Sequence, residues 1–585
     1  MQPAEARRWA REAAWPAGRR AVGAGLSAPG VAGIAIALVL GYLTLPPLVV
    51  LIQTSLATLN ARGEVVALTL NHYVNILTNG ALRVLLANTL GFALGSCLLA
   101  LGVGGMLAWI VERTNTPLRR LGYASAFMAF ALPYVLYTIA WLLLLGKGGP
   151  VNALLMSLTG STEPVLNVSS MWGMILVEGF LWSPLVFLML AAVFRAMDPA
   201  LEEAALMSGA GVWRTAFHIS FRLALPGIAA VVLLVFIRAL ESFDIPALVG
   251  LPGGVQVLTT LVYQDTRRSP PDYGEASAFG VLLMLVVLAC LWYYGRLTHS
   301  SERFQTVTGK GYRPRVTDLG RWRFLTSALV VGYFLLVMVA PLLLVVWASL
   351  LPFYRRPAIE ALASVTGKNF GAILSYPGFL EAIRNTVVLG IGAATVVMGL
   401  MALAAWLSLR GQTRMRAVLD PLASLPLVFP GIVLGLATLR LYLVLPIPIY
   451  ATLWILLVAY ATRYMPYGMR YCHAGLVQIH RELEEAAYVS GASWATTFRR
   501  VLLPLLSPAF WAGWIFVFLL SAKELAMSVL LAGPQSRVVS VMMFDLWNNG
   551  QIVEVAAFGV VWSALLALTA SGFFLLARRY GLRTY

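Results

Sequence analysis

Long, uninterrupted apolar runs dominate the chain, and short polar segments separate them. Each run has about 20 residues or more, enough for a helix to cross roughly 30 Å of hydrocarbon. The runs are continuously apolar rather than alternating, which favours membrane helices over the strands of a barrel. We predict about twelve spans, at 31–55, 88–111, 120–144, 171–194, 226–246, 276–297, 325–350, 385–408, 417–438, 450–470, 508–530 and 556–577.

The composition supports a membrane protein. Of the 585 residues, 60% are hydrophobic and 11% are charged, and the mean hydropathy is +0.81, far above what a soluble globular surface tolerates. The three cysteines, Cys97, Cys290 and Cys472, lie in or beside apolar runs without clustering. We therefore expect buried thiols, with neither a disulfide framework nor a metal site.

The net charge of +17 could suggest a nucleic-acid partner, but the basic residues lie in short segments beside the spans. They crowd the segment before the first span, the stretch 296–323 and the C-terminal end, and we count Arg120, Arg463 and Arg470 with the same side. This is the positive-inside pattern, which predicts two cytoplasmic termini and no nucleic-acid partner. The basic start resembles a signal peptide, but its long apolar run predicts an uncleaved first span.

The sequence repeats itself. The segment Glu202–Ala210 (EEAALMSGA) matches Glu484–Ala492 (EEAAYVSGA), and the match continues without a gap to Pro226 and Pro508. Further landmarks recur in the same order: Asn88-Thr89 with Asn385-Thr386, Pro133 with Pro430, and Glu241 with Glu524. The first half carries extra residues, which we expect in an external loop around 146–170.

The repeat divides the predicted spans into two sets of six. An even number of spans gives both halves the same orientation, related by a pseudo-two-fold axis along the membrane normal. We predict an all-α polytopic membrane protein with about twelve transmembrane helices in two tandem six-helix repeats. Its parts are a cytoplasmic tail 1–29, a first half 30–297 with a cytoplasmic loop at about 195–225, a cytoplasmic linker 298–323, a second half 324–577 with a cytoplasmic loop at about 471–507, and a tail 578–585.

The repeated Glu-Ala-Ala segments lie in these two cytoplasmic loops, between the fourth and fifth spans of each half. The paired alanines give a helix with a small-residue face that another protein can approach closely, and the glycine that follows ends the helix. A second short helix is expected to start at 211–213 and at 493–494. We predict a docking element formed by Glu203, Ala204, Ala205 and Gly209 in the first half and by Glu485, Ala486, Ala487 and Gly491 in the second.

These segments resemble the EAA loop of type I ABC-importer permeases, E-A-A-x-x-x-G followed by an apolar residue and L-P. The second loop has the whole pattern, including Leu503-Pro504, whereas the first has Arg222 where the proline would stand, with Pro226 next. One such motif would be weak evidence for the family, because E-A-A is a common helical tripeptide. Two motifs at equivalent positions are specific evidence. The resemblance covers essentially the whole chain and is strongest to the fused ferric-iron permeases, with thiamine and phosphonate importers close behind.

The resemblance implies a permease in the bacterial inner membrane. Its loops would dock two copies of a cytoplasmic ABC ATPase, and a periplasmic or extracellular solute-binding protein would deliver the substrate, expected to be ferric iron. ATP would be bound by the ATPase, so we expect neither catalytic residues nor a cofactor in this chain. Its Gly-Lys pairs at 146–147, 309–310 and 367–368 lack the pattern of a phosphate-binding loop. A secondary transporter could also have two parallel halves, but would not explain two matched loops.

Charged residues also occur inside the predicted spans. Arg238, Glu241 and Asp244 follow one another at intervals of three on the fifth span, and Lys523 and Glu524 lie in the equivalent region of the eleventh. Charges in the bilayer are costly and usually face a cavity or one another. Two interpretations remain open. The residues could form a polar gate near the external end of a translocation pathway, or an ion network that only braces the two central helices.

Overall fold

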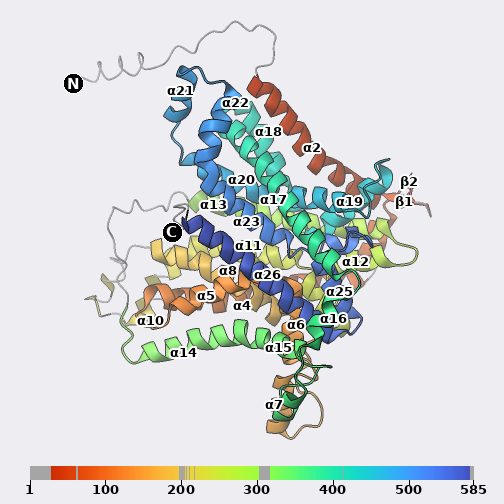
Figure 1. Ribbon diagram of the computed structural model, residues 1–585, viewed down its shortest axis with the longest axis vertical. Helices are drawn as coiled ribbons and strands as arrows, with labels where there is room; N and C mark the ends of the chain where they lie inside the picture. The colour runs from red at the N-terminus through yellow and green to blue at the C-terminus, as the bar shows by residue number, and fades with distance from the viewer. Residues whose placement is uncertain are drawn as a thin grey trace.

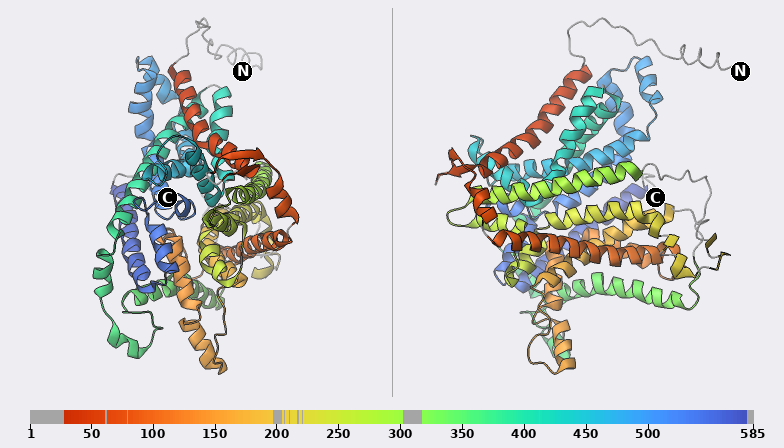
Figure 2. Two further views of the ribbon diagram at one scale, coloured as in Figure 1. Left: turned by 90° about the vertical axis from the view of Figure 1, so that its right-hand side faces the viewer. Right: turned by 180° about the vertical axis from the view of Figure 1, so that it is seen from behind.

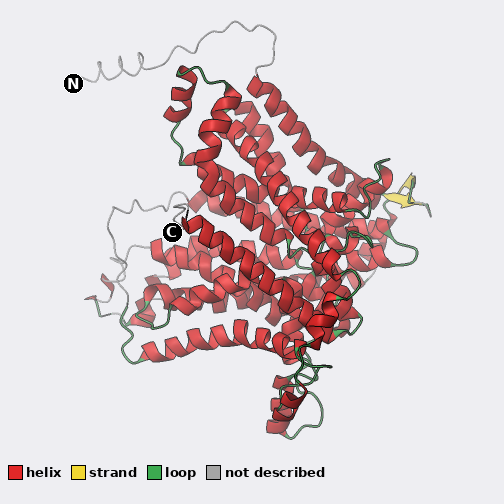
Figure 3. Cartoon of the chain, in the orientation of Figure 1, coloured by secondary structure: helices red, strands yellow, loops and turns green. Residues whose placement is uncertain are grey.

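The computed structural model describes residues 28–60, 63–78, 80–196, 204–205, 207–209, 211–215, 218–219, 221–301, 317–411 and 413–579. Glu203 lies outside this set, as do most of the N-terminal tail and parts of the first loop, the linker and the C-terminal tail. Most of the described chain is helical, and two short antiparallel strands pair at one edge (Figure 3).

The first half contains α2 (Ala28–Ser55), β1 (Ala57–Leu59), β2 (Val65–Leu68), α3 (Asn71–Thr78), α4 (Ala81–Arg113), α5 (Arg120–Ala131), α6 (Tyr134–Leu145), α7 (Pro150–Thr159), α8 (Met171–Ala196), α10 (Val212–Thr215), α11 (Phe221–Glu241), η2 (Pro246–Gly250), η3 (Leu251–Gly253), α12 (Leu258–Arg267) and α13 (Tyr273–Ser301).

The second half contains α14 (Trp322–Phe334), η5 (Leu335–Val339), α15 (Ala340–Ser349), η6 (Ile359–Ser364), α16 (Lys368–Leu374), α17 (Phe379–Arg410), α18 (Thr413–Ser424), η7 (Leu425–Val428), α19 (Gly431–Val444), α20 (Leu453–Val477), α21 (Glu482–Val489), α22 (Trp494–Thr497), η8 (Phe498–Leu502), α23 (Leu503–Ser521), α24 (Ser528–Leu531), α25 (Val539–Asn548) and α26 (Ile552–Arg579).

The described residues contain ten helices that are long and apolar enough to cross a membrane, or up to twelve if two sharply bent helix pairs each count as one span. This confirms the predicted all-α membrane fold. In Figure 1 the long helices run roughly side by side, with α10 and α21 at one end of the bundle and the strand pair, α12 and α25 at the other.

Two predicted spans are not single helices. The span expected at 120–144 breaks between α5 and α6, where Leu132 is extended and Pro133 precedes α6. The span expected at 417–438 breaks at Pro430, with a bend of 107° between its two parts. Proline disfavours helical geometry in the residue before it and lacks an N–H donor. The repeated prolines therefore mark the same break in both halves.

The spans that carry the intramembrane charges are also shorter than predicted. α11 ends at Glu241 instead of 246, and α23 ends at Ser521 instead of 530. Asp244 therefore does not continue the helical face of Arg238 and Glu241, and Lys523 and Glu524 lie in the non-helical stretch between α23 and α24. In both halves the chain leaves its helix at or just before the repeated glutamate, passes through a short non-helical stretch, and resumes in short helices.

The Asn-Thr landmark has the same structural role in both halves. Thr89 on α4 accepts a hydrogen bond from the backbone N–H of Leu258, the first residue of α12, at 3.0 Å. Thr386 on α17 does the same for Val539, the first residue of α25, at 2.9 Å. The neighbouring asparagines donate to backbone carbonyls just before those helices. In each half the Asn-Thr pair therefore provides a hydrogen-bond acceptor at the N-terminus of α12 or α25. It also fixes the segment before that helix to its own half.

The first span of each half packs on the other half. α2 lies against α18 and α19 (Figures 1 and 2), with the hydroxyls of Tyr42 and Tyr442 3.1 Å apart. α14 and α15 lie against α5 and α6, and the Tyr333 hydroxyl is 2.9 Å from Ser183 Oγ on α8. Each first span also packs on the last span of its own half, α2 on α13 and α15 on α26, so it bridges the two halves.

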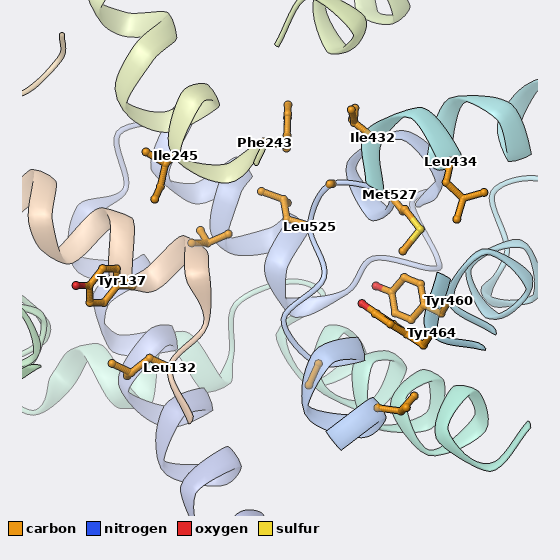
Figure 4. Close-up of a cluster of buried hydrophobic side chains, with 14 of the residues drawn as sticks. Leu132, Tyr137, Phe243, Ile245, Ile432, Leu434, Tyr460, Tyr464, Leu525 and Met527 are labelled. Atoms are coloured by element: carbon orange, nitrogen blue, oxygen red, sulfur yellow. The ribbon is translucent and has the colours of Figure 1, made fainter. Parts of the chain in front are cut away.

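The apolar core continues across the boundary between the halves. Phe243, just after α11, belongs to the same buried cluster as Leu525 and Met527, just after α23 (Figure 4). Ile432 on α19 belongs to this cluster too. All four side chains are buried, so apolar packing joins the halves beside these segments.

Candidate functional site

A cavity of about 250 Å³ lies between the two halves, next to the non-helical stretches that follow α11 and α23. Residues of both halves line it. All five charged residues expected at the gate line it. Three come from the first half, Arg238, Glu241 and Asp244, and two from the second, Lys523 and Glu524. The structure thus gathers charges that are nearly 300 positions apart in the sequence.

Three further charged residues line the same cavity: Glu178 on α8, and Arg463 and Arg470 on α20. Arg463 was counted with the cytoplasmic end of a span, which is wrong, because it is buried near the middle of α20. Glu178 is an acidic residue within an apolar run, and this alone could have identified it as a functional candidate. Arg463 left no comparable signal, because a basic residue near a predicted boundary fits the positive-inside pattern equally well.

The Glu241 carboxylate forms an ion pair between the halves. Its Oε2 accepts a hydrogen bond from Arg463 Nη2 at 2.7 Å, and Arg238 Nη1 of its own helix lies 3.5 Å away. Arg463 also donates to the carbonyl oxygens of Pro426 and Phe429. Pro430 cannot donate to the Pro426 carbonyl as a helical residue would. One guanidinium therefore supports the break at Pro430 and binds the glutamate of the other half.

Glu524 makes its contacts within its own half. Its side chain accepts from the Tyr464 hydroxyl at 2.8 Å and from the backbone N–H of Met527 at 3.2 Å. The backbone carbonyl of Glu524 accepts from Ser540 at 2.5 Å. These contacts hold the stretch after α23 in one conformation. Glu241 and Glu524 are thus equivalent in the repeat but have different partners.

The remaining polar side chains complete the lining. Glu178 on α8 accepts from Trp182 Nε1 and from Ser242, each at 2.8 Å. It therefore contacts the non-helical stretch that follows α11. Lys523 Nζ lies 5.3 Å from the centre of the Tyr134 ring, within cation–π range. Asp244 Oδ1 is buried, and no group among the residues that the structure describes hydrogen-bonds to it. The cavity can therefore offer an unsatisfied acceptor to a polar or charged solute.

The second Glu-Ala-Ala loop forms two short helices joined by a turn. Gly491 has φ +84° between α21 and α22, a left-handed conformation that favours glycine. Ser493 caps α22 by accepting from the Thr496 N–H. Glu485, Ala486 and Gly491 are exposed, and Val489 beside them is 85% exposed. The motif residues thus lie on an open surface.

An aromatic anchor holds this loop to the bundle. The Trp406 ring stacks on Trp494 and Phe498, with ring centroids 4.8 and 5.0 Å apart. Trp406 Nε1 and Arg410 Nε donate to the carboxylate of Glu484 at 3.1 and 3.0 Å. The first glutamate of the pair therefore has a buried, structural role, which leaves Glu485 exposed.

The first loop is described only in part. Gly209 has φ +83°, α10 follows at Val212–Thr215, and Met207 is 89% exposed. Ala204 is exposed and Ala205 is partly buried, while Glu203 lies outside the described residues. Gly209 therefore adopts the same left-handed turn as Gly491.

The family model of the binding-protein-dependent transport system inner membrane component matches residues 100–299 and, a second time, residues 395–581. The chain belongs to this family. The two matches agree with a fused protein of two homologous halves. A multi-pass inner-membrane location follows from the family and from the membrane-spanning helices.

Similar proteins include transporters of more than one cargo. A ferric transport system permease protein of Actinobacillus pleuropneumoniae is 25% identical over 75% of this chain and 63% of its own length. An Fe(3+)-transport system permease protein of Haemophilus influenzae is 21% identical over 84% of this chain and 90% of its own length. A spermidine/putrescine transport system permease protein of Escherichia coli is 25% identical over 36% of this chain and 80% of its own length.

The chain spans slightly less than two thirds of the length of two of the ferric transport relatives, at 63% and 65%. Among solved structures, a chain from a bacterial ABC transporter involved in the import of the acidic polysaccharide alginate matches 41% of this chain and 85% of its own length, at 20% identity and a TM-score of 0.35. That likeness is too distant to add to the assignment.

Proposed function

We propose that this chain is the permease of an ABC importer that moves ferric iron, delivered by a solute-binding protein, into the cytoplasm. The observation that carries the proposal is the combination of two matched loops at one end of the bundle with a charged cavity between the halves. The ferric transport relatives favour ferric iron over thiamine or a phosphonate. The family assignment favours an importer over a secondary transporter.

The two loops are the docking sites of two ATPase copies in this proposal. The exposed motif residues and the apolar side chains of Met207 and Val489 give each loop a surface that another protein can cover. Loops and termini then face the cytoplasm, as the basic segments around them favour. ATP is bound and hydrolysed by the partner, and the permease converts closure of the ATPase pair into movement of its halves.

The cavity acts as the gate. The Arg463–Glu241 ion pair joins the halves across the pathway. The stretch after α11 and the stretch after α23 each form hydrogen bonds within their own half. Separation of the halves must break this ion pair. The same pair in a static role would only brace the bundle, which is the alternative that the experiments must exclude.

Uptake into proteoliposomes tests the proposed function. The protein is reconstituted with its ATPase and binding protein, and the uptake of radiolabelled ferric iron, thiamine, a phosphonate and spermidine is compared. We expect ferric uptake that requires ATP and the binding protein. Uptake driven by an ion gradient without ATP would show a secondary transporter, and preference for another solute would reassign the cargo.

Docking is tested by Gly491→Val. A β-branched residue is strongly disfavoured at a positive φ, so the turn between α21 and α22 should distort. We expect loss of ATPase pull-down and of uptake, with normal amounts of protein in the membrane. Gly572→Val is the control, because Gly572 lies within α26, has no positive φ, and a Cβ there meets no atom within 4 Å. Normal pull-down and uptake by Gly491→Val would refute docking at this loop.

A further inference from the structure

An apolar groove of about 870 Å³ lies between α4 and α14, at the end of the bundle that carries the Glu-Ala-Ala loops. Gly102, Met106 and Trp109 of α4 line one side, and Trp322, Leu325 and Leu329 of α14 line the other. Because both helices cross the membrane, lipid chains are the medium around this groove.

Exposed arginines flank the residues at the mouth of the groove, where Asp318 is the one charged residue of the lining. Hydrogen bonds join the end of α4 to the start of α14: Asn115 donates to Asp318, and Leu319 N–H donates to Asn115. This junction brings two pairs of exposed arginines to the same end, Arg119 and Arg120 at the start of α5, and Arg321 and Arg323 around Trp322. Trp322 itself is 64% exposed, as is typical of a side chain at a membrane–water interface.

The acidic residue at the mouth is already engaged. The Asp318 carboxylate accepts from the Gly320 N–H and from Asn115. These hydrogen bonds, and the charge of Arg323, lower the pKa of the Asp318 carboxyl. Asp318 therefore stays charged but is compensated locally, and the exposed arginines remain in excess around it.

We propose that the groove binds an anionic phospholipid, with an acyl chain between α4 and α14 and the phosphate at the arginines beside Trp322. An apolar slot with a basic rim between membrane helices fits such a lipid, whereas a zwitterionic lipid carries a compensating positive charge. The lipid fills the space between the first span of the second half and the helices of the first half.

The repeat supplies a matched control. Gly399 follows Asn385 on α17 by the same interval as Gly102 follows Asn88 on α4. A Cβ at either glycine meets no atom within 4 Å, so both positions accept a larger side chain. Gly102 lines the groove and Gly399 lies outside it. Gly102→Leu therefore fills the groove, while Gly399→Leu changes only an exposed helix surface.

Native mass spectrometry of the purified protein, titrated with phosphatidylglycerol or with phosphatidylcholine of the same acyl chains, tests the proposal. We expect wild type and Gly399→Leu to retain one phosphatidylglycerol preferentially, and Gly102→Leu to lose it. Met106→Trp fills the same groove and should give the same loss if Gly102→Leu proves unstable. Replacing Arg321 and Arg323 with Gln should lower phosphatidylglycerol affinity about fivefold per arginine and leave phosphatidylcholine unchanged.

Three outcomes would overturn the proposal. Equal retention of the two lipids by wild type would show ordinary annular lipid. Unchanged phosphatidylglycerol binding by both groove-filling variants would place the lipid elsewhere. Competition by glycerol phosphate as effective as that by the whole lipid would show a headgroup site without an acyl-chain groove. None of these outcomes depends on the cargo or on ATPase docking.

Discussion

At the central cavity the first half supplies three carboxylates and one arginine, Glu178, Glu241, Asp244 and Arg238, whereas the second half supplies three cations and one carboxylate, Arg463, Arg470, Lys523 and Glu524. Around this cavity the two halves share their framework. Both break at a repeated proline, both leave a helix near the repeated glutamate, and both fasten the next segment with Asn-Thr. The duplicated framework thus fixes the backbone, and unmatched charges make the two halves attract each other.

The difference is clearest on α8 and α20, which the repeat aligns through Pro184 and Pro466. Leu181 stands where the second half has Arg463. A symmetric pair of arginines would repel across the cavity, and a symmetric pair of glutamates would each need a separate cation. One arginine opposite one glutamate gives a single link that can be broken and re-formed.

The largest effect is expected from Arg463→Leu. The substitution leaves Glu241 buried with Arg238 alone and leaves the Pro426 carbonyl without this donor. Removing one partner of a buried ion pair costs about 3–5 kcal/mol, so thermal unfolding in detergent should shift strongly downward and uptake should be lost. Leu181→Ala at the equivalent position of the first half is the control. The double variant Arg463→Gln with Glu241→Gln should recover part of the stability, and failure to do so would mean that the pair is not what joins the halves.

The next largest effect separates Glu241 from Glu524. Glu241→Gln weakens the link between the halves, whereas Glu524→Gln weakens contacts within one half. In the assembled importer we expect Glu241→Gln to raise ATP hydrolysis without binding protein several-fold, and Glu524→Gln to raise it less. A changed range of transported solutes with normal ATPase coupling would make the cavity a binding site instead of a gate.

A smaller effect is expected where each loop joins the next membrane helix, α11 in the first half and α23 in the second. Pro504 starts α23 in the second half, and Arg222 stands at the start of α11 where the first half would have its proline. If this makes the loops unequal, Glu203→Gln and Glu485→Gln should impair uptake to different degrees. Arg222→Pro should reduce that difference. Equal losses of uptake for the two glutamate variants, with and without Arg222→Pro, would show that this residue does not make the loops unequal.

The smallest effect tests the shared framework. Thr89→Val and Thr386→Val each remove one acceptor for the first N–H of a short helix. Each should lower the free energy of unfolding by about 1 kcal/mol, and the two losses should be alike. Thr569→Val, on an exposed part of α26, is a control without this contact. Clearly unequal losses would contradict a common framework.

The sequence was sufficient for the helices, the repeat and the loops, because long apolar runs and duplicated motifs are local patterns. It did not predict the breaks at Pro133 and Pro430. Membrane helices also tolerate proline without breaking, as Pro184 in α8 shows. The partner of Glu241 was missed for a different reason, since Arg463 lies 222 positions away in the other half and no periodicity connects residues so far apart.

The packing of each first span on the other half has a consequence for biosynthesis. α2 emerges from the ribosome early, yet the helices α18 and α19 that cover one of its faces come some 390 residues later. At about 5–20 residues per second this is a delay of roughly 20–80 s. During that time the helix must stay in the bilayer with part of its packing surface on lipid, so a chaperone or insertase of the membrane has a long opportunity to shield it. Truncated chains that end before α18 should for the same reason be preferred substrates of membrane proteases.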